Sequence, residues 1–184
     1  MTEQQTFDQE FTDMLIDHTG DANSTKENTL WPPEGLYSIE FGELDEDKDS
    51  PTYGLNKIHG FAKVPYEILE ADKNVGPGPY EHLFWMKTEQ NKGFTRDLLA
   101  RLNNLPFIEF GATVSGATML QWIRDLNGRR LLLERTSYRD KKNVIRARDK
   151  FFHDEEEYEE ATSPKQIGGD PEPSSDDITA ALDS

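Results

Sequence analysis

The stretch that decides the fold is RRLLLERTSYRDKKNVIRARDKFF, residues 129–152. It holds two runs rich in branched and aromatic residues, RRLLLERTSYR and NVIRARDKFF, with a short polar connection around residues 140–143. Two such runs joined by a tight turn predict a β-hairpin. Side chains alternate along a strand, so Arg146, Arg148 and Lys150 share one face, and Ile145 and Ala147 are expected to be buried on the other.

Three more strands are expected before this hairpin. They run over about residues 35–44, through KIHGFAKVPYEILE (57–70) with Gly60 as a bulge, and through YEHLFWMKT (80–88). Two helices are expected between the third strand and the hairpin, in GFTRDLLARLNNL (93–105) and SGATMLQWIRDLNG (115–128). Ser115 or Thr118 is placed to cap the second helix, and Gly128 to end it.

The first of these helices carries apolar residues at helical spacing, which predicts one face packed on a sheet. These residues are Phe94, Leu98, Leu99, Leu102 and Leu105. Three strands, a helical insertion and two strands is the element order of a five-stranded OB-like barrel, and it defines a mainly β fold. Other small α+β folds are compatible with the same order.

The two ends of the chain have a different composition from the middle. Residues 1–30 are predicted to form an acidic arm with one short helix, because Phe7, Phe11, Met14 and Leu15 recur at helical spacing. Residues 31–153 are predicted to form the core. Residues 154–184 are rich in acid, Ser, Pro and Gly, which predicts a disordered tail.

Charge follows the same division. The net charge of −16 hides a basic middle, because residues 57–153 carry seventeen cations against eleven carboxylates. Residues 1–56 carry two cations against fourteen carboxylates, and residues 154–184 carry one against eleven. Local fields select partners within a Debye length of about 10 Å, so the overall pI is a poor guide to partners and the basic middle favours an anionic one. The alternative is that these Lys and Arg residues only solvate exposed strand faces.

Several classes of chemistry have no support in the sequence. There is no cysteine, and the four histidines at 18, 59, 82 and 153 have no metal-ligand spacing. Asp45, Asp47 and Asp49 suggest a calcium loop, but Ser50 and Asn56 stand where glycine and glutamate are required. No phosphate-binding loop, nucleophile elbow or apolar run of about 20 residues is found. We therefore expect a protein without enzymatic activity, metal or cofactor, and with no membrane segment.

The remaining pattern is a basic region interleaved with aromatic residues, which is typical of surfaces that bind single-stranded nucleic acid. Cations follow the phosphates, and flat side chains stack on bases. The predicted phosphate contacts are Arg129, Arg130, Arg135, Arg139, Lys141, Lys142, Arg146 and Arg148. Tyr138 and Trp85 are the predicted stacking residues, whereas Phe84, Trp122 and Phe151 are expected in the core.

The acidic tail has a function in this hypothesis. A tethered polyanion can compete with nucleic acid for a cationic surface, and it can carry a docking motif for partner proteins. The predicted motif is at the tip, where Ile178 and Leu182 follow Asp176 and Asp177. A solvated terminus without function is the alternative.

The chain resembles a family of phage-encoded single-stranded DNA-binding proteins. The resemblance covers about residues 31–152 and is carried by PYEILEA, GPGPYEHLFWMK, FTRDLLARLNNL, DLNGRRLLLE and KKNVIRARDKFF. The C-terminus is similar to the acidic tail of such proteins, but Asp183 and Ser184 replace the family's apolar terminal residues. The resemblance implies an OB fold, sequence-tolerant binding, no catalysis, and recruitment of replication or recombination proteins by the tail.

We therefore expect a single-stranded DNA-binding protein of phage replication or recombination, in the cytoplasm of a bacterial host. An acidic inhibitor that mimics DNA and binds a host enzyme through residues 1–56 or 154–184 is the alternative. A virion or scaffold component is a third option. The sequence leaves the oligomeric state open, a homo-oligomer included.

Overall fold

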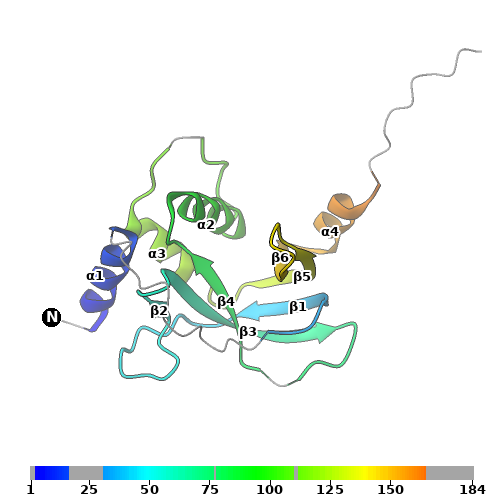
Figure 1. Ribbon diagram of the computed structural model, residues 1–184, viewed down its shortest axis with the longest axis horizontal. Helices are drawn as coiled ribbons and strands as arrows, with labels where there is room; N and C mark the ends of the chain where they lie inside the picture. The colour runs from blue at the N-terminus through cyan, green and yellow to red at the C-terminus, as the bar shows by residue number, and fades with distance from the viewer. Residues whose placement is uncertain (1–2, 17–30, 77, 110–111, 165–184) are drawn as a thin grey trace, which may run out of the picture.

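This computed structural model describes residues 3–16, 31–76, 78–109 and 112–164. These residues contain six strands and four helices. The strands are β1 (Gly35–Phe41), β2 (Leu55–Asn56), β3 (Phe61–Ala71), β4 (Tyr80–Trp85), β5 (Arg130–Arg139) and β6 (Ile145–Phe152). The helices are α1 (Glu3–Ile16), α2 (Glu89–Leu102), α3 (Gly116–Arg124) and α4 (Glu155–Thr162). Figure 1 shows α2 above the sheet and α1 beside α3. The predicted mainly β class, with two helices inserted before the final hairpin, is confirmed.

All strand pairs are antiparallel, and the sheet order is β2-β3-β1-β5-β6, with β4 on β3. The long strand β3 pairs with β4 and β2 over its first half and with β1 over its second half. Strand β1 is central, because Ile39 lies between Ile68 of β3 and Leu131 of β5. The register shifts between Ser38 and Ile39, an irregularity that bends and twists a strand.

The closed barrel expected from the sequence is not confirmed, because the sheet is open. No backbone ladder joins β4 to β6 in the described chain. Side chains fill the space between them instead: the His82 ring lies edge-on against Phe151, with ring centroids 4.8 Å apart. The two-residue strand β2 was not predicted, and Gly60, expected as a bulge, turns the chain from β2 into β3 with a φ of 71°.

Each inserted helix has a side-chain cap, and of the two only Ser115 was predicted from the sequence. Thr88 caps α2 by accepting the Asn91 N–H, and Ser115 caps α3 by accepting the Thr118 N–H. Helix α3 ends at Arg124, before Gly128, which turns the chain into β5 with a φ of 77°.

The apolar residues of α2 do not all share one buried face, which corrects the sequence prediction. Leu99 and Leu102 are buried together with Thr95. Phe94 remains 65% exposed, and Leu105, which was predicted to share the face, lies beyond the end of α2 and is 38% exposed. The helix turns about 100° per residue, which places Phe94 on a different stripe from Leu99.

The N-terminal segment is part of the core where the structure describes it, and it is not a separate arm. The predicted helix is confirmed as α1, and Phe7, Phe11 and Met14 are buried. Arg124 of α3 donates hydrogen bonds to Asp8 and Glu46, which ties α1 and the β1–β2 connection to α3. Burial of three large side chains explains why this acidic segment packs rather than remaining in solvent.

The predicted disordered tail begins as a helix. Asp154 caps α4, and Glu155, Glu156 and Glu157 occupy the first turn, where carboxylates stabilise a helix. Tyr158 of α4 lies edge-on against Phe152, with ring centroids 5.2 Å apart. The predicted docking residues Asp176, Asp177, Ile178 and Leu182 lie outside the described residues. None of the helices in the described chain is long and apolar enough to cross a membrane.

Candidate nucleic-acid interface

The β5–β6 hairpin extends beyond the rest of the sheet. Strand β1 pairs with β5 only as far as Arg135, whereas β5 continues to Arg139. Within the described residues, the four pairs from Thr136↔Arg148 to Arg139↔Ile145 therefore have no third strand beside them. Residues 136–139 and 141–148 are all exposed. We call residues 136–148 the hairpin arm.

The arm has no buried face, which corrects one prediction. Ile145 is 63% exposed and Ala147 is also exposed, although both were expected to be buried. Asp149 and Phe151 lie on the same face of β6, nearer the core, but the core ends before it reaches Ile145 and Ala147. Strand alternation therefore predicted which residues share a face and not where the core stops.

One face of the arm combines cations with an aromatic ring. Tyr138 lies opposite Arg146 in the register, and the Arg148 guanidinium carbon lies 4.7 Å from the centre of the Tyr138 ring. Tyr138 is 43% exposed. A guanidinium against an aromatic ring is a favourable cation–π contact, and it orients both groups.

The turn at the tip is fixed by Asp140. Its carboxylate accepts the backbone N–H groups of Lys142 and Val144, and it accepts a hydrogen bond from Arg146 Nε at 3.0 Å. These bonds, led by the Val144 N–H, lower the pKa of Asp140 below its ordinary value. Asn143 adopts a φ of 61°, a conformation that asparagine tolerates better than most residues. The tip therefore presents its cations on a defined backbone.

The arm carries five cations against the single carboxylate of Asp140. Arg139 lies on the face of Ile145, and its Nη1 donates to the Asn143 carbonyl at 3.3 Å. Lys141 and Lys142 are exposed in the turn. Positive charge therefore surrounds the arm on both faces and at the tip, as a surface that follows phosphates requires.

The root of the arm is different, because Arg135 is buried. Arg135 is 4% exposed, and its Nη2 donates to Asp149 Oδ2 at 2.7 Å. Its guanidinium carbon also lies 4.3 Å from the centre of the Trp31 ring. This geometry does not support the predicted phosphate contact from Arg135.

Asp149 also faces His82 of β4. His82 Nδ1 lies 3.4 Å from Asp149 Oδ2, and both side chains are largely buried. Burial acts to raise the pKa of Asp149, but the neighbouring His82 and Arg135 outweigh it, so the pKa lies below its ordinary value. The side-chain atoms Asp149 Oδ1, His82 Nδ1, Arg135 Nε and Tyr66 Oη are buried without a hydrogen-bond partner. This polar cluster anchors the arm to β4.

Three other predicted site residues lie away from the arm. Arg130 is nine residues from Arg139 along β5, or about 30 Å, and its Nε donates to Glu40 at 2.7 Å. Arg129, just before β5, donates to the Asp125 carbonyl at 3.3 Å. Trp85 is 43% exposed, but it lies opposite Phe61, at the start of β3. The hairpin arm lies toward the other end of β3, because β1 pairs with the second half of β3 and joins β5 to it as far as Arg135.

Sequence reasoning missed some residues and placed others well. Phe84 and Phe151 are buried and Trp122 is half-buried, close to the expected core placement. Lys150 was predicted to share a face of the last strand with Arg146 and Arg148, which the register confirms, but it was not among the predicted site residues. The roles of Trp31, His82 and Asp149 were missed, because nothing in their spacing distinguishes them from surface residues.

The carboxylate of Asp45 is hydrogen-bonded to donors within its own loop. Asp45 Oδ2 accepts the hydroxyls of Ser50 and Thr52, and Asp45 Oδ1 accepts the Asp47 N–H. Across residues 3–16, 31–76, 78–109 and 112–164, no cluster of three or more His, Asp or Glu residues is placed to hold a metal ion.

No protein-family model and no curated protein matches this chain. The candidate interface is therefore defined by the geometry of the arm alone.

Proposed function

We propose that this chain is a non-enzymatic protein that binds single-stranded DNA with little sequence preference, in phage replication or recombination. The observation that carries the proposal is the hairpin arm, which holds five cations and an exposed tyrosine on a ribbon that no other strand of the described chain flanks. The phage setting rests on the resemblance of the sequence motifs.

The arm matches the two requirements for binding a single strand. Bases can stack on the face of Tyr138 that Arg148 leaves open, and such stacking contributes about 1–3 kcal/mol per base. Arg139, Lys141, Lys142 and Arg146 can contact phosphates on either side of that ring. Stacking and charge do not read base edges, so the binding is sequence-tolerant.

The strand pairing supports an OB-like arrangement as part of this proposal. The ladders β1·β3, β3·β4, β1·β5 and β5·β6 are those of an OB barrel, left open between β4 and β6. In an OB-like protein the final hairpin borders the ligand-binding face. This is the position of the arm.

The acidic ends fit the same proposal. Residues 154–184 restrain binding by competing for the arm, and the Asp176–Leu182 segment recruits replication or recombination proteins. The carboxylate excess of these residues supports an electrostatic competition that weakens as salt rises. The site of action is the bacterial cytoplasm.

Fluorescence anisotropy tests this function with labelled oligo-dT and a duplex of equal length. We expect the single strand to bind more tightly. We also expect log affinity to fall linearly with log salt, by about 0.7 for each phosphate contacted. Equal binding of both DNAs would contradict the single-strand preference, and no binding at low salt would favour the DNA-mimic alternative.

Two double variants locate the surface. Arg146→Glu/Arg148→Glu reverses two charges on the arm and should weaken binding at least about 100-fold, because two cations beside the proposed path of the DNA become carboxylates that repel phosphates. Arg129→Glu/Arg130→Glu makes the same charge change at the far end of β5, and we expect at most about a threefold loss there. Equal losses from both pairs would mean that the arm is not the principal site.

A further inference from the structure

Trp31 lies at the root of the hairpin arm, and a cation covers one face of its ring. The Arg135 guanidinium carbon is 4.3 Å from the centre of the Trp31 ring, a distance typical of cation–π contacts. Trp31 is nevertheless 38% exposed, close to the 43% of Tyr138 in the proposed DNA site. Trp31 and Tyr138 therefore repeat one arrangement, an arginine stacked on an exposed ring, at the root of the arm and near its tip.

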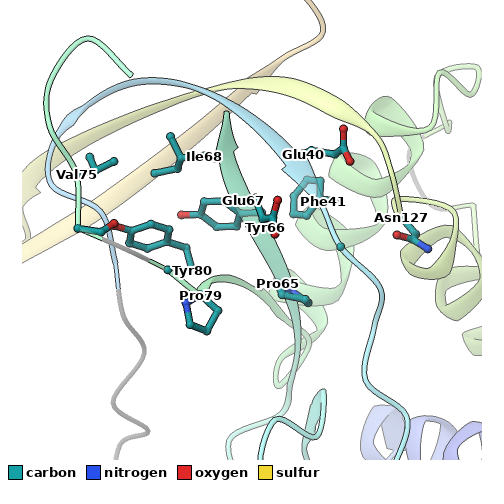
Figure 2. Close-up of a pocket in the computed structure, with 13 residues that line it drawn as sticks. Glu40, Phe41, Pro65, Tyr66, Glu67, Ile68, Val75, Pro79, Tyr80 and Asn127 are labelled. Carbon is teal, nitrogen blue, oxygen red and sulfur yellow. The ribbon is translucent and has the colours of Figure 1, made fainter. Parts of the chain in front are cut away.

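Arg135 supports the Trp31 ring from the core and is too buried to contact a ligand itself. It is 4% exposed, and its Nη2 donates to Asp149 Oδ2 at 2.7 Å. The Tyr66 hydroxyl is buried nearby: burial raises the pKa of Tyr66 above its ordinary value, and the charge of Arg135 opposes that rise. Figure 2 shows the Tyr66 and Tyr80 rings side by side, with centroids 5.9 Å apart. The core therefore fixes Arg135, and the Trp31 ring covers it on the solvent side.

The face of the arm that continues from Arg135 is exposed and partly apolar. The next two pairs on this face are Ser137↔Ala147 and Arg139↔Ile145, about 7 and 13 Å along the strand from Arg135. All four side chains are exposed, and Ile145 is 63% exposed. They include one cation and no carboxylate. An exposed apolar surface that continues from a stacked tryptophan is typical of an interaction site.

We propose that Trp31 is a second base-stacking residue of the single-stranded DNA site, and that the DNA runs from Trp31 past Ala147 and Ile145 to the cations of the tip. This inference rests on the proposed function. Indole is the largest aromatic side chain, so it offers a base a wide ring to stack on.

Charge favours DNA over a second copy of the chain as the occupant of this face. Arg139 lies on the face, and Lys141 and Lys142 border it at the turn. A second copy packed on the same face would bring these cations of both molecules together, and like charges repel. Phosphates are attracted by the same cations.

The root of the arm contributes stacking more than charge. Asp72 and Lys73 both lie beside Gly35, which pairs with Arg135, so one carboxylate and one ammonium offset each other there. Glu34 is also exposed near the root. Loss of the Trp31 ring should therefore lower the affinity for DNA without changing its dependence on salt.

The test uses the full chain and labelled oligo-dT in the anisotropy assay. Trp31→Ala should weaken binding about 5- to 150-fold, the effect of losing one stacked base, with an unchanged salt slope. Trp85→Ala is the matched control, because Trp85 is also an exposed tryptophan but lies toward the other end of β3, and it should weaken binding less than about threefold. Tyr138→Ala is measured beside them.

Tryptophan emission gives a second readout on variants that keep an aromatic ring. Oligo-dT should quench the emission of the wild type and of Trp85→Phe, because both retain Trp31. Trp31→Phe should bind oligo-dT nearly as tightly as the wild type and lose most of the quenching. Quenching that persists in Trp31→Phe and disappears in Trp85→Phe would overturn the proposal.

A third variant tests the path of the DNA without changing Trp31. Ala147→Glu places a carboxylate on the exposed face and should weaken binding at least about tenfold, because it repels phosphates. Ala161→Glu makes the same change at an exposed position of α4 and should have less than about a threefold effect. Equal effects of these two variants would exclude the path.

The outcomes separate this inference from the proposed function. If Trp31→Ala binds as tightly as Trp85→Ala while Tyr138→Ala binds weakly, the arm binds DNA and the role of Trp31 is rejected. If the wild type binds no oligo-dT, both are rejected. A wild-type dimer that Ala147→Glu dissociates without DNA, measured by sedimentation, would identify the face as an interface between two copies and exclude the DNA path.

Discussion

The root and the tip of the β5–β6 hairpin use the same residue types for different purposes. At the root, Arg135 and Asp149 are buried as an ion pair between β4 and Trp31. At the tip, Arg146 and Asp140 form an exposed pair that holds the turn. Only a few residues of the same two strands separate the pairs.

The difference teaches that an arginine on the core-facing side of β5 is buried only where β1 still pairs with that strand. There the neighbouring strands exclude water, and a charge must have a partner. Beyond Arg135 no further strand of the described chain flanks the hairpin, so its arginines are exposed to solvent. The predictions below test this contrast, from the largest expected effect to the smallest.

Asp149→Ala should destabilise the protein by about 3–5 kcal/mol, because it leaves Arg135 buried without its partner. Urea unfolding followed by circular dichroism measures the change. Asp140→Ala at the tip removes an exposed pair and two turn hydrogen bonds, and it should cost much less than Asp149→Ala. Similar costs at both positions would contradict the distinction between root and tip.

Acid should remove the contribution of Asp149. The pKa of this carboxyl is below its ordinary value in the folded protein, so its stabilising effect is present above the unfolded pKa of about 4 and is lost as pH falls below it. The difference in unfolding free energy between wild type and Asp149→Asn should therefore shrink from pH 6 to pH 3. A constant difference across that range would show that the ionised carboxylate is not the stabilising form.

Tyr138→Ala should weaken oligo-dT binding by about 5- to 150-fold, the loss of one stacking contact of about 1–3 kcal/mol. The salt slope should stay unchanged, because no cation is removed, and unfolding in urea should change by less than about 0.5 kcal/mol, because the ring is 43% exposed. Tyr138→Phe is the control and should bind nearly as wild type. A steep loss in Tyr138→Phe would mean that the hydroxyl, and not the ring, makes the contact.

Arg130→Ala should have the smallest effect. It removes an exposed ion pair with Glu40, which contributes less than about 1 kcal/mol to stability, at a site far from the arm. Oligo-dT affinity should fall less than threefold in the anisotropy assay. A loss as large as that of Tyr138→Ala would extend the DNA site along the whole of β5.

Much of the fold could be predicted from local patterns. Alternation in RRLLLERTSYR and NVIRARDKFF predicted the hairpin, and Ser115 predicted the start of α3. Two errors share one cause. The acidic composition predicted an arm with one short helix over residues 1–30 and a disordered tail over residues 154–184, but in the described parts, residues 3–16 and 154–164, Phe7, Phe11 and Tyr158 find apolar partners. Composition averages over a segment, whereas packing depends on a few large side chains.

The candidate site was only partly predictable. The sequence brought Tyr138, Arg146 and Arg148 together, because pairing across a tight turn fixes which residues are neighbours. It could not separate Arg135 from Arg139, since both lie on the same face of the same strand. Their environments differ because β1 ends between them.

By itself, the sequence determined the hairpin, the faces of its strands, the capped helices and the concentration of cations near the hairpin turn. These features depend on residues close together in the chain. The tertiary structure alone decided that β4 and β6 remain unpaired in the described chain, that Arg135 is buried, and that Glu40 and Glu67 lie opposite each other on β1 and β3. Those features depend on contacts between distant segments, whose lengths and registers no local pattern specifies.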